Sequence, residues 1–121
     1  MKRVLFLTSK NFSRWGASVI PQLQAAFADY EIMHAVEPEI NPETLSADLV
    51  FMYDKIDGEN RDISTALLER RIPLVMLCLG SLTSMEVIND YLQRGVTAYM
   101  EVSFVPRPYV DYITDILGFP Q

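Results

Sequence analysis

The sequence has few of the residues that most catalytic and metal-binding sites need. Among its 121 residues there is one cysteine, Cys78, and one histidine, His34. A single cysteine excludes an intrachain disulfide, a CxxC redox pair and a cysteine zinc site. Nucleophilic systems of the Ser-His-Asp or Cys-His kind require that His34 be the base. Carboxylates remain as the only plausible metal ligands, so the composition indicates little about activity.

Long hydrophobic runs and basic clusters are also missing. The longest apolar run, residues 72–79, has the length of a buried strand, whereas a transmembrane helix needs about twenty apolar residues. The basic start, residues 1–3, precedes an apolar run too short for a signal peptide. The ten Lys and Arg residues are scattered and the net charge is −6, which argues against nucleic acid as a main partner. We therefore expect a cytoplasmic protein that binds neither nucleic acid nor membranes.

What is present is an alternation of apolar strands and amphipathic helices. Half of the residues are hydrophobic, which is enough for one globular domain over residues 1–121. The pattern predicts strands at residues 3–8, 31–36, 48–53, 72–79 and 96–102. It predicts helices at residues 18–29 and 63–70, a helix capped by Ser84 and stopped by Gly95, and a last helix from Pro106 to Gly118. A very short helix, from Asn41 to Leu45, is expected between the second and third strands.

Strands that are apolar at nearly every position are typical of a parallel sheet with both faces covered. We predict an α/β fold, a three-layer αβα sandwich with a single five-stranded parallel sheet of order 2-1-3-4-5. Ligands of such sheets bind beyond the carboxyl ends of the strands. A site would therefore involve residues 8–16, 53–58 and 80–84.

Three segments resemble the receiver domain of bacterial response regulators. They are ADLVFMY at residues 47–53, IPLVMLC at 72–78, and GVTAYMEVSF at 95–104, followed by Pro106. The similarity covers about residues 47–117 and implies the flavodoxin-like fold of that family. In receivers the third strand ends in the phosphorylated aspartate and the first in two acidic residues that hold magnesium. The fourth strand ends in Thr or Ser, and a Lys-Pro pair follows the fifth.

This chain differs from the family at each of these positions. Thr8 and Ser9 replace the acidic pair, Tyr53 the phosphorylated aspartate, Cys78 the Thr or Ser, and Val102 with Ser103 the Lys-Pro pair. Asp54 lies one residue beyond the phosphoacceptor position, and because successive strand side chains point to opposite faces, we expect it to be a solvated loop residue. Without an acidic pair or the lysine, phosphotransfer has no chemical support.

The resemblance and these losses together lead to the hypothesis of a degenerate pseudo-receiver. It would act in signalling as a phosphorylation-independent protein-protein interaction or dimerisation module, with no cofactor and no enzymatic activity. Its partner would be another protein or a second copy of the chain. Aromatic residues and Met are enriched in interface cores. The candidate interaction face is therefore Tyr99, at the position of the family's switch aromatic, with Met100, Tyr109 and Tyr112.

The alternative is a Rossmann-like ligand-binding domain, related to or excised from a larger enzyme, that takes a nucleotide, sugar nucleotide or flavin. It depends on the long loop predicted at residues 8–16, where hydroxyls, Lys10 and backbone amides could cradle an anion. Phe12 and Trp15 could stack on a flavin or base, although packing over the sheet edge is the more ordinary role. The GxxxxGK[ST] and GxGxxG spacings are absent.

The remaining polar residues have structural interpretations. His34 is expected to be a half-buried residue of an edge strand, and Cys78 an unreactive, buried thiol. The acidic run of Asp54, Asp57, Glu59 and Asp62 is expected to contribute helix capping and solubility.

Overall fold

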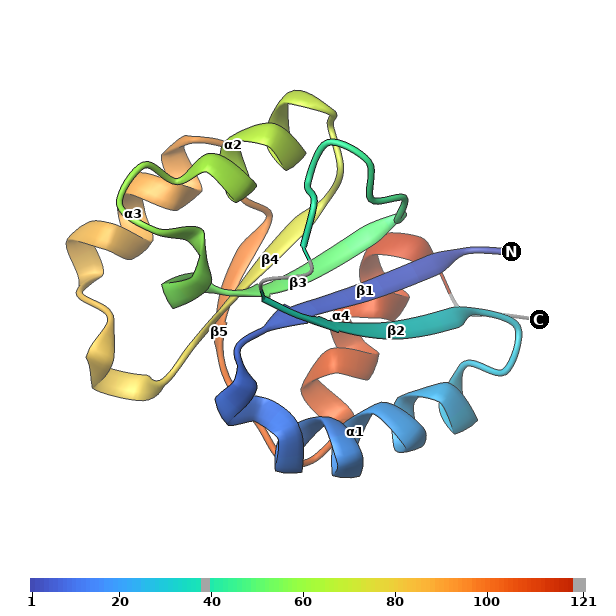
Figure 1. The fold of residues 1–121 in the computed structure, drawn as a ribbon. Coiled ribbons are helices and arrows are strands. Elements are labelled where there is room, and N and C mark those ends of the chain that lie inside the picture. Colours follow the sequence, from blue (N-terminus) through green and yellow to red (C-terminus); the bar gives the residue numbers. More distant parts are fainter. Residues whose placement is uncertain (38–39, 119–121) are drawn as a thin grey trace.

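Five parallel strands form the centre of the molecule, which a computed structural model describes over residues 1–37 and 40–118. The strand order is β2-β1-β3-β4-β5 (Figure 1). The bounds are Arg3–Thr8 for β1, Glu31–Val36 for β2, Leu49–Tyr53 for β3, Leu74–Cys78 for β4 and Ala98–Glu101 for β5. The predicted five-stranded parallel sheet of order 2-1-3-4-5 is therefore confirmed.

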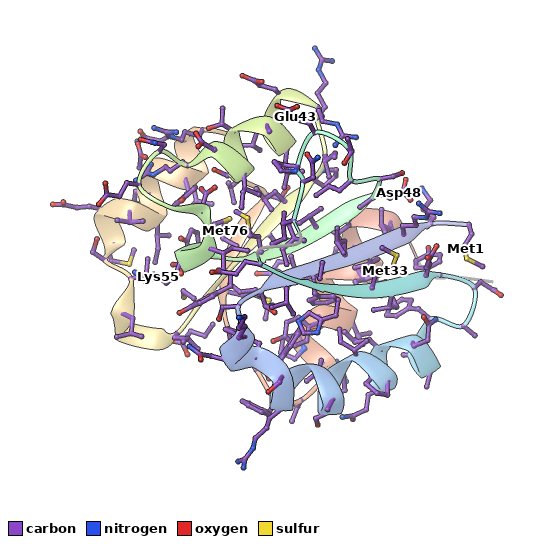
Figure 2. The ribbon with its side chains drawn as sticks, viewed as in Figure 1. Met1, Met33, Glu43, Asp48, Lys55 and Met76 are labelled. Atoms are coloured by element: carbon purple, nitrogen blue, oxygen red, sulfur yellow. The ribbon has the colours of Figure 1, made fainter. Side chains whose placement is uncertain are left out.

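Within the described residues, four α-helices cover the two faces of this sheet. They are α1 (Ser13–Ala26), α2 (Asp62–Glu69), α3 (Met85–Gln93) and α4 (Arg107–Leu117). Figure 1 shows α1 and α4 on one face and α2 and α3 on the other. Since neighbouring strand residues point to opposite faces, Phe6 and Phe51 join the core under α1 and α4, whereas Leu7 and Met52 join the core under α2 and α3. The predicted three-layer arrangement is confirmed, and Figure 2 shows side chains such as Met76 inside it and Glu43 outside.

The first helix begins earlier than predicted. A single residue, Ser9, separates β1 from a 3-10 turn, η1 (Lys10–Phe12), which leads directly into α1. A helix is present where one was predicted over residues 18–29, but the predicted start was wrong because it placed Pro21 in the first turn, whereas Pro21 lies inside α1. The apolar side chains of Trp15, Val19 and Leu23 lie at helical spacing and are buried. Their burial outweighs the local cost of a proline inside the helix. The long first loop does not exist.

The connection between β2 and β3 is a turn. The backbone N–H groups of Thr44 and Leu45 donate to the Asn41 carbonyl, and the Asn41 side chain accepts from the Glu43 N–H at 3.1 Å. Asn41 thus caps a single turn, and the described residues of this connection form no helix. One turn leaves only a few apolar side chains on this part of the sheet, among them Ile40 and Leu45.

The ends of the later helices follow the sequence signals. The Ser84 hydroxyl accepts from the Val87 N–H at 3.3 Å and caps α3 as predicted. Gly95 and Gly118, with φ angles of 112° and 87°, follow α3 and α4 in conformations that glycine adopts most readily. Among the described residues, no helix is long and apolar enough to span a membrane.

Candidate functional site

The residues predicted to form a degenerate receiver site lie at the carboxyl edge of the sheet. Thr8 ends β1, Tyr53 ends β3, Cys78 ends β4, and Val102 follows β5. The ladders pair Tyr53 with Leu77, and Cys78 with Glu101, so the strand ends are adjacent. Thr8, Tyr53 and Cys78 are buried and Val102 is half-buried.

The Thr8 hydroxyl is paired with a neighbouring strand. It lies 2.5 Å from the His34 Nε2 atom, and the His34 ring meets the indole of Trp15 edge to face at 5.5 Å. Burial lowers the pKa of His34 below its ordinary value of 6.5. The hydroxyl oxygen of Ser9 is buried and has no hydrogen-bond partner among the described residues. His34 is half-buried, as predicted, and neither Thr8 nor Ser9 supplies a carboxylate to this edge.

Tyr53 and Cys78 occupy the next two strand ends as neutral side chains. The Tyr53 ring lies 4.7 Å from that of Phe12 in η1. Burial, followed by the charge of Asp54, raises the pKa of both the Tyr53 hydroxyl and the Cys78 thiol. A raised pKa keeps Cys78 out of its nucleophilic thiolate form, in line with its interpretation as unreactive.

Asp54 is not the solvated loop residue that the sequence suggested. The chain turns at once into the 3-10 helix η2 (Asp54–Asp57), and the Asp54 side chain is only 7% exposed. Its Oδ2 atom accepts hydrogen bonds from the Thr83 hydroxyl and, at 3.1 Å, from the Tyr99 hydroxyl. Its Oδ1 atom is buried and has no hydrogen-bond partner among the described residues. The prediction failed because strand alternation says nothing about a residue that has already left the strand.

Tyr99 is turned inward by this contact. Its ring is half-buried on β5, and burial, followed by the Asp54 charge and hydrogen bond, raises the pKa of Tyr99 far above its ordinary value. The neutral Tyr99 hydroxyl thus donates to a buried carboxylate, which gives Asp54 a second hydrogen-bond donor beside Thr83.

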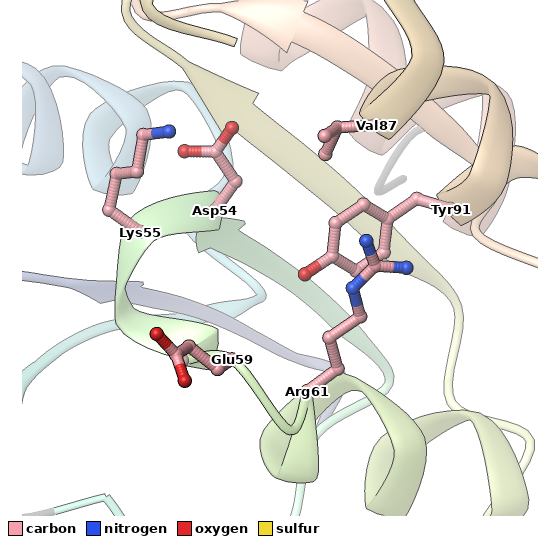
Figure 3. Close-up of a pocket in the computed structure, with 7 residues that line it drawn as sticks. Asp54, Lys55, Glu59, Arg61, Val87 and Tyr91 are labelled. Carbon is pink, nitrogen blue, oxygen red and sulfur yellow. The ribbon is translucent and has the colours of Figure 1, made fainter. Parts of the chain in front are cut away.

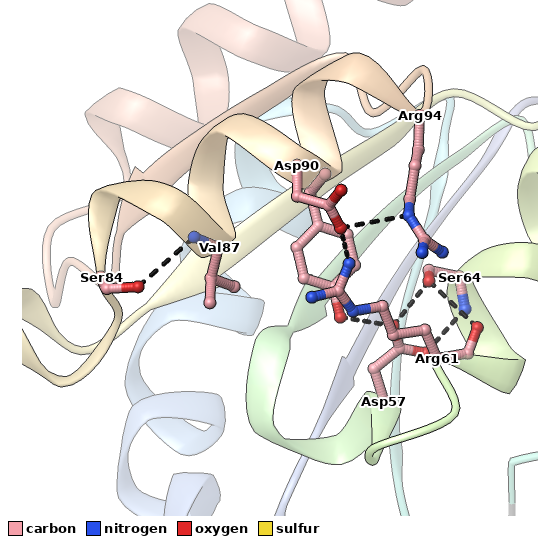
Figure 4. A network of polar contacts seen from close by, with 8 residues as sticks. Asp57, Arg61, Ser64, Ser84, Val87, Asp90 and Arg94 are labelled. Atoms are coloured by element: carbon pink, nitrogen blue, oxygen red, sulfur yellow. Dashed lines mark hydrogen bonds and ion pairs between the residues drawn. The ribbon is translucent and has the colours of Figure 1, made fainter.

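A second buried carboxylate, Asp57, connects η2 to α2 and α3. It accepts from the Ser64 N–H at 2.8 Å, from the Ser64 hydroxyl at 2.5 Å and from the Tyr91 hydroxyl at 2.6 Å (Figure 4). Burial, followed by the hydrogen bond and charge of Asp57, raises the pKa of Tyr91. Asp57 therefore caps α2, as predicted for the acidic run, but it does so while buried. Asp57 is seven residues from Ser64, beyond the two or three residues of an ordinary cap, so this contact and the link to Tyr91 both needed the fold.

Arg61 extends the same network through contacts with Tyr91 and Asp90. It adopts a left-handed backbone conformation with φ 54° before α2, and its guanidinium lies 4.5 Å above the Tyr91 ring. It contacts Asp90, which also binds the Nε atom of Arg94 at 3.2 Å. These contacts join α2 to α3 by charge and by a cation-π interaction.

An open hollow of about 460 Å³ lies between η2 and α3 (Figure 3). Its walls include Asp54, Lys55, Arg61 and Tyr91, so charges of both signs line it. The Lys55 Nζ atom donates to the Leu82 carbonyl at 3.1 Å. The described residues contain no group of three or more His, Cys, Asp or Glu side chains that could hold a metal ion.

The four residues of the predicted interaction face do not share one surface. Met100 and Tyr112 are half-buried against the core under α1 and α4. Tyr99 is also half-buried but packs on the opposite face of the sheet, and Tyr109 is fully buried and cannot be a surface contact. Tyr109 was misplaced because the first turn of α4 points its ring at the sheet, where it packs edge to face on Phe6 and Phe51.

Tyr109 instead belongs to a hydrogen-bond cluster that sequence reasoning missed. Its hydroxyl accepts from the Ser103 N–H at 2.8 Å and donates to the Ser103 carbonyl at 2.9 Å. The Trp15 Nε1–H donates to the same carbonyl at 2.9 Å and to the Tyr109 hydroxyl at 3.1 Å. The cluster therefore ties the loop after β5 to α1 and α4. Trp15 and Phe12 are core residues, as their ordinary interpretation predicted.

Comparison with solved structures identifies the architecture. The chain is similar to a CheY-like response regulator receiver domain protein of Methanospirillum hungatei JF-1, with a TM-score of 0.71 and 21% identity over 95% of this chain and 92% of that one. The chain has the receiver-domain fold. The chain also resembles a response regulator receiver protein of Burkholderia phymatum, with a TM-score of 0.64 and 14% identity over 99% of this chain and 98% of that one. A response regulator protein of Burkholderia multivorans has the same architecture, with a TM-score of 0.58 and 20% identity over 100% of this chain and 98% of that one. No family model and no curated protein sequence matches the chain.

Proposed function

We propose that the chain is a phosphorylation-independent pseudo-receiver, a single cytoplasmic domain that acts in signalling as a protein-protein interaction or dimerisation module and not as an enzyme. The receiver-domain fold supports a regulatory role by analogy, and the chemistry of the carboxyl edge supports independence from phosphorylation.

The observation that carries the proposal is the set of side chains at the strand ends. An acyl phosphate site needs a carboxylate nucleophile, carboxylates for magnesium and a cation for the phosphoryl oxygens. The corresponding side chains here are Tyr53, then Thr8 and Ser9, and then Val102. None of these four can carry charge of the required kind at neutral pH.

Asp54 does not replace the missing nucleophile. Its Oδ2 atom is occupied by the hydroxyls of Thr83 and Tyr99, and its Oδ1 atom is shielded from solvent. A carboxylate must be exposed to an incoming phosphodonor in order to attack it in line. We therefore assign Asp54 a structural role, in which it holds Tyr99 against the end of β3.

The interaction role is supported by the side chains left on the predicted face. Met100 and Tyr112 are half-buried on β5 and α4, and Met and aromatic residues are common in interface cores. The alternative, a ligand-binding domain, depended on a long first loop, and its basis is removed because residues 10–12 form a turn that continues into α1.

Light scattering across a wide concentration range, with and without acetyl phosphate and Mg²⁺, tests the proposal. We expect self-association or partner binding that the phosphodonor leaves unchanged. If the chain dimerises, Met100→Asp should shift it toward the monomer, whereas Gln22→Asp, on the exposed side of α1, should not. A change of assembly caused by the phosphodonor and lost in Asp54→Asn would refute the proposal.

A further inference from the structure

The exposed large apolar side chains of the described residues gather at the carboxyl edge. Four of the seven lie in the two loops that follow β4 and β5, and a fifth, Met85, is the first residue of α3; the other two are Met1 and Leu92. We call this set the carboxyl-edge surface, and it comprises Leu79, Leu82, Met85, Phe104 and Val105, which are 39–67% exposed. Two of these side chains, Leu79 and Phe104, line one hollow, and exposed apolar side chains that lie together mark interaction sites on globular domains.

A small hollow opens beside this surface. It measures about 180 Å³ and is lined by Asn11, Phe12, Trp15, Leu79, Val102 and Phe104. Two of these lining residues carry a polar side-chain group, Asn11 and Trp15. The indole N–H of Trp15 already donates to the Ser103 carbonyl, so the lining is mainly apolar. A cavity of about 150 Å³ can admit a benzene ring, so this hollow has room for one bulky apolar side chain.

Hydrogen bonds fix the loop that carries Phe104 and Val105. Ser103 is bonded to Trp15 and Tyr109, both fully buried, and its hydroxyl accepts from the Val105 N–H at 3.1 Å. Phe104 therefore projects from a loop fixed on both sides. A fixed loop loses little conformational entropy when a partner binds, which favours recognition at this place.

The segment that supplies one wall of the hollow, residues 10–16, carries positive charge. It contains Lys10 and Arg14, both exposed, and no Asp or Glu, in a chain whose net charge is −6. Arg107 is paired with Asp111 at 3.3 Å, and Glu101 lies against the loop after β4, where a Cβ at Gly80 would be 4.0 Å from its Oε1 atom. The wall with Lys10 and Arg14 thus complements a negatively charged group of a partner.

We infer that the carboxyl-edge surface binds an acidic peptide segment of a partner protein, with one aromatic or aliphatic side chain seated in the hollow. This inference rests on the proposed function as an interaction module and adds the surface and the chemistry of its partner. A second copy docked through the same face would bring the like-charged segments together, which disfavours that occupant.

Selection from a displayed library of random peptides tests the inference, followed by fluorescence anisotropy of the selected peptides in labelled form. We expect the selected sequences to combine Asp or Glu with a bulky apolar residue. Phe104→Ser should weaken binding about tenfold or more. Leu92→Ser is the matched control, since Leu92 has nearly the exposure of Leu79 but lies at the far end of α3, and it should leave affinity unchanged. Lys10→Glu with Arg14→Glu should also weaken binding, as should added salt.

Other outcomes separate this inference from the proposed function. Basic peptides, or peptides whose binding is lost in Met100→Asp but kept in Phe104→Ser, would overturn the inference and leave an interaction module elsewhere on the domain. A dimer that Phe104→Ser dissociates would show that a second copy is the occupant and would also overturn it. No selected binder, together with a monomer at all concentrations, would overturn both.

Discussion

The hydroxyl of Tyr109 should contribute measurably to folding because it completes the cluster around Ser103. Tyr109→Phe removes one acceptor and one donor from a fully buried site while keeping the ring. The ring contacts with Phe6 and Phe51, at centroid distances of 5.6 and 5.7 Å, should remain. The substitution therefore isolates the effect of the hydroxyl on stability.

The expected cost follows from the groups that lose their partner. The Trp15 Nε1–H retains the Ser103 carbonyl at 2.9 Å, but the Ser103 N–H loses its acceptor. A buried donor left without a partner costs about 1–3 kcal/mol. We expect Tyr109→Phe to lower the free energy of unfolding by about 2 kcal/mol and Tm by roughly 5 to 10 °C. Urea denaturation followed by fluorescence is suitable, because Trp15 is the only tryptophan and lies in the cluster.

Tyr112→Phe is the matched control on the same helix. The Tyr112 side chain is half-buried, and its hydroxyl has no hydrogen bond to any described residue, so we expect a change within about 0.5 kcal/mol. If Tyr109→Phe proved no more destabilising than Tyr112→Phe, the Ser103 cluster would not hold the β5–α4 loop, and the case for a fixed surface would fail with it.

Three further predictions concern other parts of the core. A Cβ at Gly16 would lie 2.6 Å from the His34 ring. Replacing a helical glycine by alanine ordinarily raises the free energy of unfolding by about 1 kcal/mol, and we expect Gly16→Ala to show this gain only in a His34→Ala background. Equal effects of Gly16→Ala in both backgrounds would contradict the contact. Asp57→Asn should cost about 2–3 kcal/mol in urea unfolding, because Ser64 and Tyr91 lose a charged acceptor, and a cost near zero would contradict this network. Because burial lowers the pKa of His34, the unfolded chain binds its proton first. The free energy of unfolding should therefore be highest above about pH 6.5 and fall as the pH drops below that value. Denaturation at several pH values tests this, and His34→Gln should flatten the dependence.

The central strands β1, β3 and β4 could be predicted from sequence because they are apolar on both sides. All five strands overlap their predicted ranges, and the strand order is that of the flavodoxin-like fold which the resemblance implied. The start of α1 could not be predicted in the same way. Pro21 is a strong local signal for a helix start. The burial of Trp15 and Val19 against the sheet outweighs this signal, and that burial is known only from the fold.

The site was predictable at the strand ends and unpredictable just beyond them. Thr8, Tyr53 and Cys78 lie where a parallel sheet must place them. Asp54 was misjudged because its burial depends on Thr83 and on Tyr99, which come from segments 29 and 45 residues away. The inward position of Tyr109 depends in the same way on contacts distant in sequence, which a single chain without its fold does not display.

Intact-protein mass measurement after incubation with acetyl phosphate and Mg²⁺ tests independence from phosphorylation most directly. The wild-type chain and Asp54→Asn should be compared under conditions that preserve acyl phosphates. We predict that neither protein gains a phosphoryl group, since Asp54 is shielded and the neighbouring strands β1, β3 and β4 end in Thr8, Tyr53 and Cys78, none of which is a carboxylate. A phosphoryl adduct on the wild-type chain that is absent from Asp54→Asn would contradict the account.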